Sequence, residues 1–285
     1  MRAVSKKAVC SESAMSRTEA INIHQAHELI LRLEKVGFDS AWTQRIITNH
    51  DYAQRIVSFI REGGQQETIN QQKARQIMGD RFIGVREVAE HLGIILDNDQ
   101  LKRVAYIPFK EDTLQKCKDT HLLFLGVSWN AYGQGLTINK LREMFPKGGN
   151  PRFVLYKGDN ASWFDLEDFA LLITPEIRWY LIRTDILEES RSKGFNEQMR
   201  LLQNNEYLEN AVVYVYAKIL YYLARGIVIF RNTWTRCSDL RDRGPNHISI
   251  GSYGDPYGSC EIRVGYGDSQ TRHLLGVAPA VKPDA

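Results

Sequence analysis

The stretch RCSDLRDRGPNHISIGSYGDPYGSCEIRVGYGDSQTRHLLGVA, residues 236–278, differs from the rest of the chain in pattern and composition. It contains two alternating runs, at 248–250 and 260–264. Successive strand residues point to opposite faces, so the apolar members are predicted to be buried and the polar members between them to face outward. The predicted buried set is Ile248, Ile250, Cys260, Ile262 and Val264, and the opposite face carries Ser249, Glu261 and Arg263.

A turn is predicted between the two runs, which together form a β-hairpin. The connecting residues 254–258 read GDPYG. Pro256 presets φ for the second residue of a turn, and Gly258 closes it. A further apolar run at 274–278 is predicted to add a last strand alongside.

From Arg241 to Leu274 the chain has no Lys, Met, Trp, Phe or Ala, whereas Gly, Ser, Tyr, Asp and Arg recur. Two interpretations remain open. Any surface hairpin with long turns is rich in Gly, Ser and Asp. The same residues are also typical of antibody-like binding surfaces, where Tyr supplies contact area and Ser, Gly and Asn supply adaptable hydrogen bonds.

Several phrases carry a resemblance to a known family. They are RCSDL at 236–240, the G-x3-I-x-I-G spacing from Gly244 to Gly251, LGVA at 275–278, and upstream IMGDRFIGVREVAEHLGI, IPFKEDTLQKCKDTHLL and RWYLIRTDILEES. The chain after about Val36 resembles the variable proteins of bacterial diversity-generating retroelements. The resemblance implies a C-type-lectin-like ligand-binding fold of the formylglycine-generating-enzyme type. It also implies a segment, about 238–274, whose adenine-containing codons an error-prone reverse transcriptase rewrites.

In that family, rewritten Asn codons yield Tyr, Ser, Gly, Asp, His and Arg but not Lys, Met, Trp, Glu or Gln. The segment fits, except that Glu261 and Gln270 must be unvaried positions. We expect Tyr253, Tyr257 and Tyr266 to be the main anchors, because aromatic and Arg side chains dominate interface energetics. The expected ligand-facing set is Arg241, Asp242, Arg243, Asn246, His247, Ser249, Ser252, Tyr253, Asp255, Tyr257, Arg263, Tyr266, Asp268, Arg272 and His273.

The predicted fold class is α+β, in three parts. Residues 1–18 lack the apolar run of a signal peptide and are expected to form a disordered lead-in. Residues 19–118 show helical periodicity and are expected to form a helical domain, with Asp39 or Ser40 capping a helix, a break at 49–51, a polar linker at 65–72 and a helix at 85–92. Residues 119–285 are expected to form the C-type-lectin-like domain, in which the first and last strands pair.

Within 119–285, strands are predicted at 121–127, 152–156, 179–183 and 233–237, and helices at 138–145, 195–202 and 211–223. The run 211–230 is the longest apolar one, but Lys218 and Arg225 interrupt it. Burial of each Lys or Arg in the centre of a bilayer costs about 2.5–3.5 kcal/mol of free energy. We therefore expect this run to form a buried core helix, and we expect no membrane contact.

A DNA-binding regulator is the alternative function. The segment IGVREVAEHLGI, within 83–105, has the residue pattern of the first helix and turn of a helix-turn-helix module. In this alternative, the rest of the chain is a C-terminal sensor domain. Such modules need a basic second helix, whereas the next residues are apolar and then acidic. The net charge of only +3 over 285 residues also disfavours nucleic acid as a partner.

Catalytic and metal-binding patterns do not emerge. His24 and His27 lack a carboxylate partner, and Asp165, Glu167 and Asp168 fit helix-end charges. The four cysteines are widely spaced, which fits buried thiols in a reducing cytoplasm. The sequence therefore predicts a cytoplasmic, non-enzymatic protein without cofactor or metal, which binds an unknown protein or other macromolecular ligand. It does not indicate the ligand, the oligomeric state or the role of the N-terminal part.

Overall fold

The computed structural model describes residues 23–35, 37–61, 66–154, 162–242, 244–253, 258–266 and 273–284. The chain divides into two compact units, 1–56 and 57–285. The second unit holds two five-stranded sheets and a single hydrophobic core, and helices are present in both units. The α+β class is thus confirmed.

The first unit contains α1 (Ile23–Lys35), α2 (Ser40–Thr48) and the first part of α3 (His50–Arg61). Asp39 caps α2, since its carboxylate accepts hydrogen bonds from the N–H groups of Ala41 and Trp42 at 2.9 and 3.1 Å. Asn49 separates α2 from α3, as predicted. None of the side chains described in these helices is buried.

Residues 65–72 do not form the expected linker over their whole length. Helix α4 (Ile69–Met78) begins inside them, capped by Thr68 in a capping box with Gln71. The T-x-x-Q signal of that box outweighs the polar composition, because it satisfies N–H groups that a helix start leaves open. Gln71 is itself buried, and its Nε2 donates to the Val104 carbonyl at 2.7 Å.

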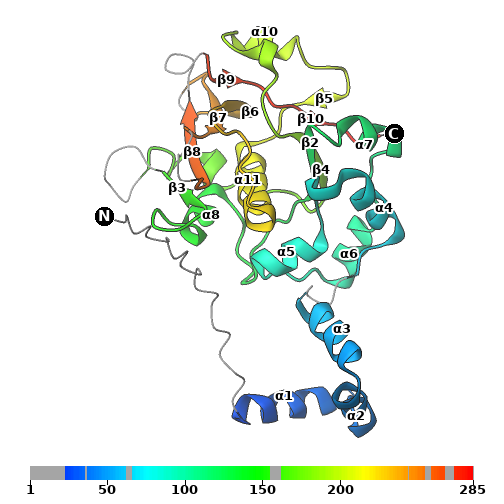
Figure 1. The fold of residues 1–285 in the computed structure, drawn as a ribbon. Helices are drawn as coiled ribbons and strands as arrows, with labels where there is room; N and C mark the ends of the chain where they lie inside the picture. Colours follow the sequence, from blue (N-terminus) through cyan, green and yellow to red (C-terminus); the bar gives the residue numbers. More distant parts are fainter. Residues whose placement is uncertain are drawn as a thin grey trace, which may run out of the picture. The chain divides into compact units, whose positions relative to one another are not determined.

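The first sheet has the order β1-β2-β4-β10-β5 (Figure 1). Its strands are β1 (Phe82–Ile83), β2 (His121–Leu125), β4 (Trp179–Arg183), β10 (Ala280–Val281) and β5 (Glu206–Tyr207). β1 runs parallel to β2, with Phe82 opposite Leu123. The expected domain boundary at 118 is therefore wrong: residues before it supply a strand to this sheet and side chains to the common core.

Further helices and short 3-10 turns complete the second unit. They are η1 (Gly79–Arg81), α5 (Val85–Leu92), α6 (Asn98–Val104), α7 (Glu111–Cys117), α8 (Ile138–Met144), α9 (Asp168–Leu171), η2 (Glu188–Ser190) and α10 (Phe195–Met199). The helices predicted at 85–92, 138–145 and 195–202 are thus present.

The second sheet has the order β3-β8-β7-β6-β9. Its strands are β3 (Arg152–Phe153), β8 (Glu261–Tyr266), β7 (His247–Gly251), β6 (Trp234–Leu240) and β9 (Leu275–Gly276). The predicted hairpin is confirmed: β7 and β8 are antiparallel, with Ile250 opposite Val264. The five predicted buried residues are all in the core, while turn residues 254–257 lie outside the described residues. The last apolar run pairs with β6, in parallel.

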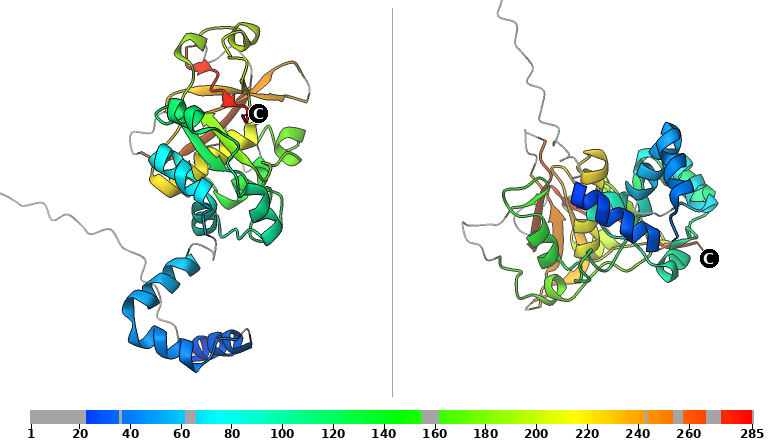
Figure 2. Two further views of the ribbon diagram at one scale, coloured as in Figure 1. Left: turned by 90° about the vertical axis from the view of Figure 1, so that its right-hand side faces the viewer. Right: turned by 90° about the horizontal axis from the view of Figure 1, so that it is seen from below.

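Helix α11 (Ala211–Arg225) lies between the two sheets (Figures 1 and 2). The Tyr216 hydroxyl donates to the Leu125 carbonyl of β2 at 3.1 Å, and the Tyr214 hydroxyl donates at 2.7 Å to the carbonyl of Ala278, which lies between β9 and β10. The expected core helix is confirmed. Among the described residues, no helix is both long and apolar enough to span a membrane.

One expectation for a C-type-lectin-like domain is not met. β10, the last strand, pairs with β4 and β5, so β4 separates it from β2. The first and last strands of 119–285 therefore lie in one sheet without pairing directly.

Candidate ligand-binding surface

The structure describes ten of the fifteen residues expected to face a ligand. Arg243, Asp255, Tyr257, Asp268 and Arg272 lie outside the described residues. The other ten do not form one continuous surface. Three of them lie in one cluster and two in another, on opposite faces of the second sheet. Two more are buried, and Asn246, His247 and His273 belong to neither cluster.

The first cluster, here called the Arg241 patch, consists of Trp163, Glu167, Arg241, Asp242 and Tyr266. The guanidinium carbon of Arg241 lies 4.3 Å from the ring centre of Tyr266 and 5.7 Å from that of Trp163. The two rings meet edge to face at 4.6 Å. Arg241 Nε lies 3.4 Å from Glu167 Oε1, so one cation is held by two rings and a carboxylate.

Backbone hydrogen bonds fix this patch between β6 and β7. In the turn, the Arg241 N–H donates to the Asn246 carbonyl at 2.9 Å. The Asp242 N–H donates to Glu167 Oε2, and the Asp168 N–H donates to Asp242 Oδ2, both at 2.8 Å. These reciprocal bonds join the turn to the start of α9.

The carboxylates near α9 therefore act as hydrogen-bond acceptors. Glu167 holds the β6–β7 turn, and Asp165 accepts from the Ser162 N–H at 2.7 Å while pairing with Arg142. Their interpretation as structural charges fits these contacts. Sequence reasoning did not include Trp163 or Glu167 in the site, because their partners lie more than seventy residues away and only the fold brings them together.

The Arg241 patch combines a fixed cation with exposed apolar area. Tyr266 is 43% exposed, and Leu240 and Leu166, the sequence neighbours of Arg241 and Glu167, are 50% and 86% exposed. Arg and Tyr that are already held in place lose little conformational freedom on binding. This arrangement suits recognition of a macromolecular surface.

The second cluster lies on the other face of the hairpin. The Tyr253 ring packs edge-on against Trp234 at 5.7 Å, and the Arg263 guanidinium lies 5.2 Å from its centre. In the register, Trp234 and Arg263 both pair with Gly251, whereas Tyr266 pairs with Ile248, three residues from Gly251 along β7. Since alternate pairs point to opposite faces, the expectation that Tyr253 and Tyr266 share one surface is wrong.

Ser249 and Ser252 were expected to be exposed, and both are buried, at 5% and 2% exposure. Ser249 lies on the central strand opposite Arg236, which is buried by bonds to the Lys193 carbonyl and Gln198 in the α10 region. The Ser252 hydroxyl donates to the Phe230 carbonyl at 3.1 Å. The Arg236 contacts cover Ser249 on the outer face of the sheet, which alternation alone cannot predict. Ser252 has the same parity as the buried Ile248 and Ile250, and Lys218 of α11 lies 3.4 Å from its hydroxyl, so it faces the core side.

The remaining described residues are intermediate or exposed. The His247 ring stacks on Phe195 with centres 3.5 Å apart and is half-buried, whereas Asn246 and His273 are exposed. The His273 carbonyl accepts a hydrogen bond from Arg191. His247 is thus partly used by packing, and its Nδ1 lies 3.1 Å from the Cys237 carbonyl oxygen.

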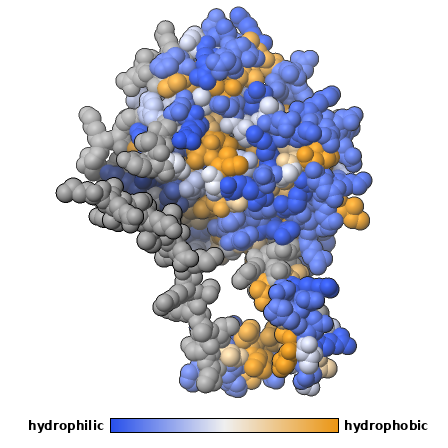
Figure 3. Space-filling model, in the orientation of Figure 1, coloured by the Kyte–Doolittle hydropathy of each residue, from blue (hydrophilic) through white to orange (hydrophobic). Residues whose placement is uncertain are grey.

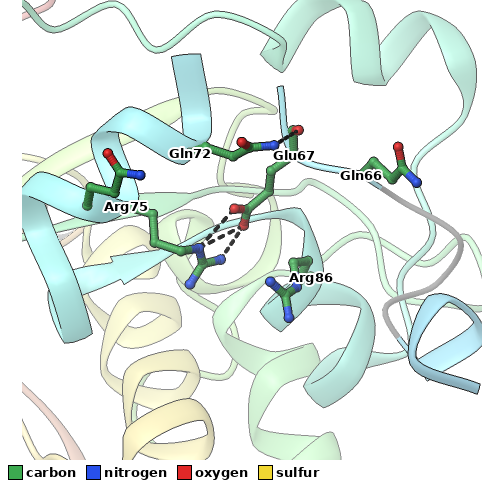
Figure 4. A pocket seen from close by; sticks show the side chains of 6 residues that line it. Gln66, Glu67, Gln72, Arg75 and Arg86 are labelled. Carbon is green, nitrogen blue, oxygen red and sulfur yellow. Dashed lines mark hydrogen bonds and ion pairs between the residues drawn. The ribbon is translucent and has the colours of Figure 1, made fainter. Parts of the chain in front are cut away.

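A polar pocket of about 400 Å³ lies elsewhere in the second unit, lined by Gln66, Glu67, Gln72, Arg75, Gln76 and Arg86 (Figure 4). Arg75 donates to both carboxylate oxygens of Glu67 and of Glu87. Burial alone would raise the pKa of Glu87, but hydrogen bonds from Arg75 and Arg225 outweigh it and hold that pKa at about 2. The Arg75 donors are thus occupied within the protein, so this network joins α4, α5 and α11.

The buried cysteines do not offer a nucleophile. Burial raises the pKa of the Cys260 thiol to about 11 and that of the Cys237 thiol well above its usual value. A thiol reacts as thiolate, and both stay protonated at neutral pH. The prediction that Cys237 and Cys260 are buried free thiols is confirmed.

The helix-turn-helix alternative concerns α5 and α6. Asp97 caps α6 and Asp99 lies in its first turn, so carboxylates occupy the end that would approach DNA phosphates. The Val104 carbonyl at its other end accepts hydrogen bonds from Trp179 and Gln71. The alternative remains a hypothesis, and no feature of these helices favours it.

Comparisons of this chain with protein-family models, with curated proteins and with solved structures give no match.

Proposed function

We propose that the protein is a non-enzymatic ligand-binding protein, a variable protein of a diversity-generating retroelement. Its ligand is a protein or another macromolecule, bound chiefly through the Arg241 patch. The observation that carries this proposal is the arrangement of Arg241 between Tyr266 and Trp163, with Glu167 fixing it and Tyr266 left 43% exposed. The C-type-lectin-like scaffold and the diversification mechanism are part of the same proposal.

The separation of buried and exposed positions along the β7–β8 hairpin supports diversification. Ile248, Ile250 and Ile262 are fully buried, so the core is carried by alternate positions. Exposed residues outside this set, such as Asn246 and Tyr253, can then change without opening the core. A surface that varies needs this separation.

Sequencing the gene's neighbourhood tests the origin of the segment. We expect a reverse-transcriptase gene and a near-copy of the 3′ segment that differs mainly at adenines. Differing codons should fall on exposed or half-buried positions, including Arg241, Asp242, Asn246, Tyr253 and Tyr266, and should spare Ile248, Ile250, Ile262 and Val264. Differences concentrated on the core positions, or no near-copy at all, would remove the retroelement proposal.

Affinity measurements test the patch. A binder selected from a displayed peptide or protein library against the wild-type protein supplies the probe. Tyr266→Ser should weaken its binding about 30-fold, equivalent to about 2 kcal/mol, the range of an interface hot spot. The control is Tyr106→Ser, since Tyr106 is 66% exposed and lies outside the patch. Equal affinity of both variants for every selected binder would contradict the assignment of the patch.

A further inference from the structure

Two buried polar atoms without a hydrogen-bond partner lie side by side in the first sheet. Among the described residues, five buried side-chain nitrogen and oxygen atoms have no such partner, and two of these are His121 Nε2 and Arg183 Nε. The two residues pair directly across β2 and β4. Opposed residues of an antiparallel pair project to the same face, with Cβ atoms about 5 Å apart. Since buried polar groups are normally paired, two unpaired ones together indicate a place where a ligand can bind.

The His121 ring offers a hydrogen-bond donor at this place. His121 is only 5% exposed, and its Nδ1 lies 2.8 Å from the Thr120 hydroxyl oxygen. When this hydroxyl donates to Nδ1, the neutral ring carries its proton on Nε2. The Thr120 contact therefore orients the ring with a donor at the unpaired position, and the group that this donor requires is an acceptor.

Two arginines add positive charge beside this donor. Arg183 and Arg81 are both half-buried, and among the described residues no carboxylate lies within 4 Å of either guanidinium. Arg81 Nη1 donates to Thr184 Oγ1 at 2.8 Å, next in sequence to Arg183. After burial, the charges of Arg183 and then Arg81 lower the pKa of His121 to about 4, so both act on its ring.

The acidic residues close to the ends of β1, β4, β5 and β10 bond to other groups. The carboxylates of Asp185, Glu206 and Asp284 accept hydrogen bonds from backbone N–H groups at 2.8, 2.9 and 2.5 Å. That of Asp80 lies 3.9 Å from Arg225. Half-buried charges are costly without a counter-ion, so Arg81 and Arg183 favour an anion from outside the chain.

We propose that Arg81, Arg183 and His121 bind a phosphate dianion, either inorganic phosphate or the phosphate group of a small ester. Guanidinium groups match phosphate oxygens in geometry, and two of them balance the nearly two negative charges of a phosphate group at neutral pH. A carboxylate would balance only one. His121 Nε2 donates a further hydrogen bond to the anion.

The half-buried arginines give the anion access from solvent. A charged ligand also suits the surface of the second unit, because hydrophilic residues predominate on the face drawn in Figure 3 and apolar ones form separate patches. The site belongs to the first sheet, whereas the Arg241 patch belongs to the second. Phosphate binding is therefore independent of the macromolecular ligand proposed above.

Isothermal titration calorimetry of the full chain tests the site, with inorganic phosphate as the probe at pH 7 and ionic strength held constant with sodium chloride. Wild type should bind one phosphate per chain, at least tenfold more tightly than acetate. Arg183→Gln should weaken phosphate binding at least tenfold, the loss expected for one charge-assisted hydrogen bond. Arg103→Gln is the matched control, since it removes the same charge at an exposed position of α6 and should bind as wild type does.

Histidine signals in an NMR titration of wild type give a second measurement that needs no variant. Bound phosphate should raise the pKa of His121 from about 4 towards 6.5 and should leave the signals of exposed His27 in place. If Arg183→Gln does not fold, Arg81→Gln provides the same comparison. The proposal is overturned if phosphate does not move the His121 signals, or if acetate binds as tightly as phosphate. It is equally overturned if the arginine variant binds phosphate no more weakly than Arg103→Gln.

Discussion

Gly251, at the end of β7, leaves no space for a side chain. A Cβ atom there would lie 2.4 Å from the Thr233 carbonyl oxygen and 2.7 Å from the Trp234 ring. Neither the backbone of Thr233 nor the buried indole of Trp234 can move away without a cost in packing. We therefore expect Gly251→Ala to lower the free energy of unfolding, measured by urea denaturation, by about 2–3 kcal/mol. Gly148→Ala is the control, since a Cβ there meets nothing within 4 Å. Similar losses in the two variants would contradict this role of Gly251.

His121, at the start of β2, makes the free energy of unfolding depend on pH. Burial, and then the nearby Arg183 and Arg81, lower its pKa from 6.5 to about 4. The folded histidine therefore stays neutral where the unfolded one takes up a proton. Stability is lost as pH falls from about 6.5 towards 4, by up to about 3 kcal/mol.

His121→Gln should remove that part of the pH dependence in denaturant unfolding between pH 7 and 4. The comparison must be made against wild type, because burial raises the pKa values of Glu209 and Asp239, which makes their effect opposite in sign. The same substitution at exposed His27 should leave the profile as in wild type. A His121→Gln profile parallel to that of wild type would disprove the assignment.

At the scale of elements, Glu87 joins three helices. It lies on α5 and pairs with Arg75 of α4 at 2.7 Å and Arg225 of α11 at 2.9 Å. Removing one member of a buried ion network leaves the others uncompensated, so Glu87→Gln should cost about 3 kcal/mol at pH 7. Glu90→Gln, at an exposed position of the same helix, should cost little.

The same carboxylate gives a second measurement. Its folded pKa of about 2 lies below the usual 4.5, so its stabilisation is complete above pH 4.5 and is lost as pH falls towards 2. In Glu87→Gln this acid-dependent loss should be smaller by about 3 kcal/mol in unfolding experiments across that range. If Glu87→Gln lost as much stability as wild type between pH 4.5 and 2, the network would not stabilise the protein.

Elements with a strong local signal were predictable from sequence. The alternation of apolar and polar residues predicted the β7–β8 hairpin, and the apolar run from Ala211 predicted α11. Both patterns arise because buried positions must be apolar. The start of α4 was missed, although Thr68 and Gln71 carry its signal, because the surrounding residues are polar. β1 was missed for a different reason: two residues are too few for periodicity, and only its pairing with β2 makes it a strand.

At the scale of the molecule, the candidate site was only partly predictable. Tyr266 and Arg241 were expected from composition, but their partners Trp163 and Glu167 come from a distant segment that carries no local signal. Burial of Ser249 likewise depends on Arg236 and α10 covering the sheet. Alternation tells which side a residue faces, whereas the tertiary fold decides whether that side is open.

The position of the domain boundary leads to the last prediction. A boundary at 118 would let 119–285 fold alone, yet the core of that part includes Phe82, Ile83 and Val88, all fully buried. Fragment 119–285 loses β1 from the first sheet and exposes that apolar surface. We therefore expect it to lack a cooperative thermal transition in calorimetry and by circular dichroism.

Fragment 66–285 keeps both sheets, α11 and the Glu87 network, so it should unfold cooperatively within a few degrees of the full chain. Among the residues that the structure describes, none before Ala74 belongs to the core cluster, so removal of 1–65 deletes none of the buried contacts described. A cooperative transition of 119–285 near the temperature of 66–285 would reinstate the boundary at 118. Failure of 66–285 to fold would instead mean that α1–α3 contribute to the stability of the core.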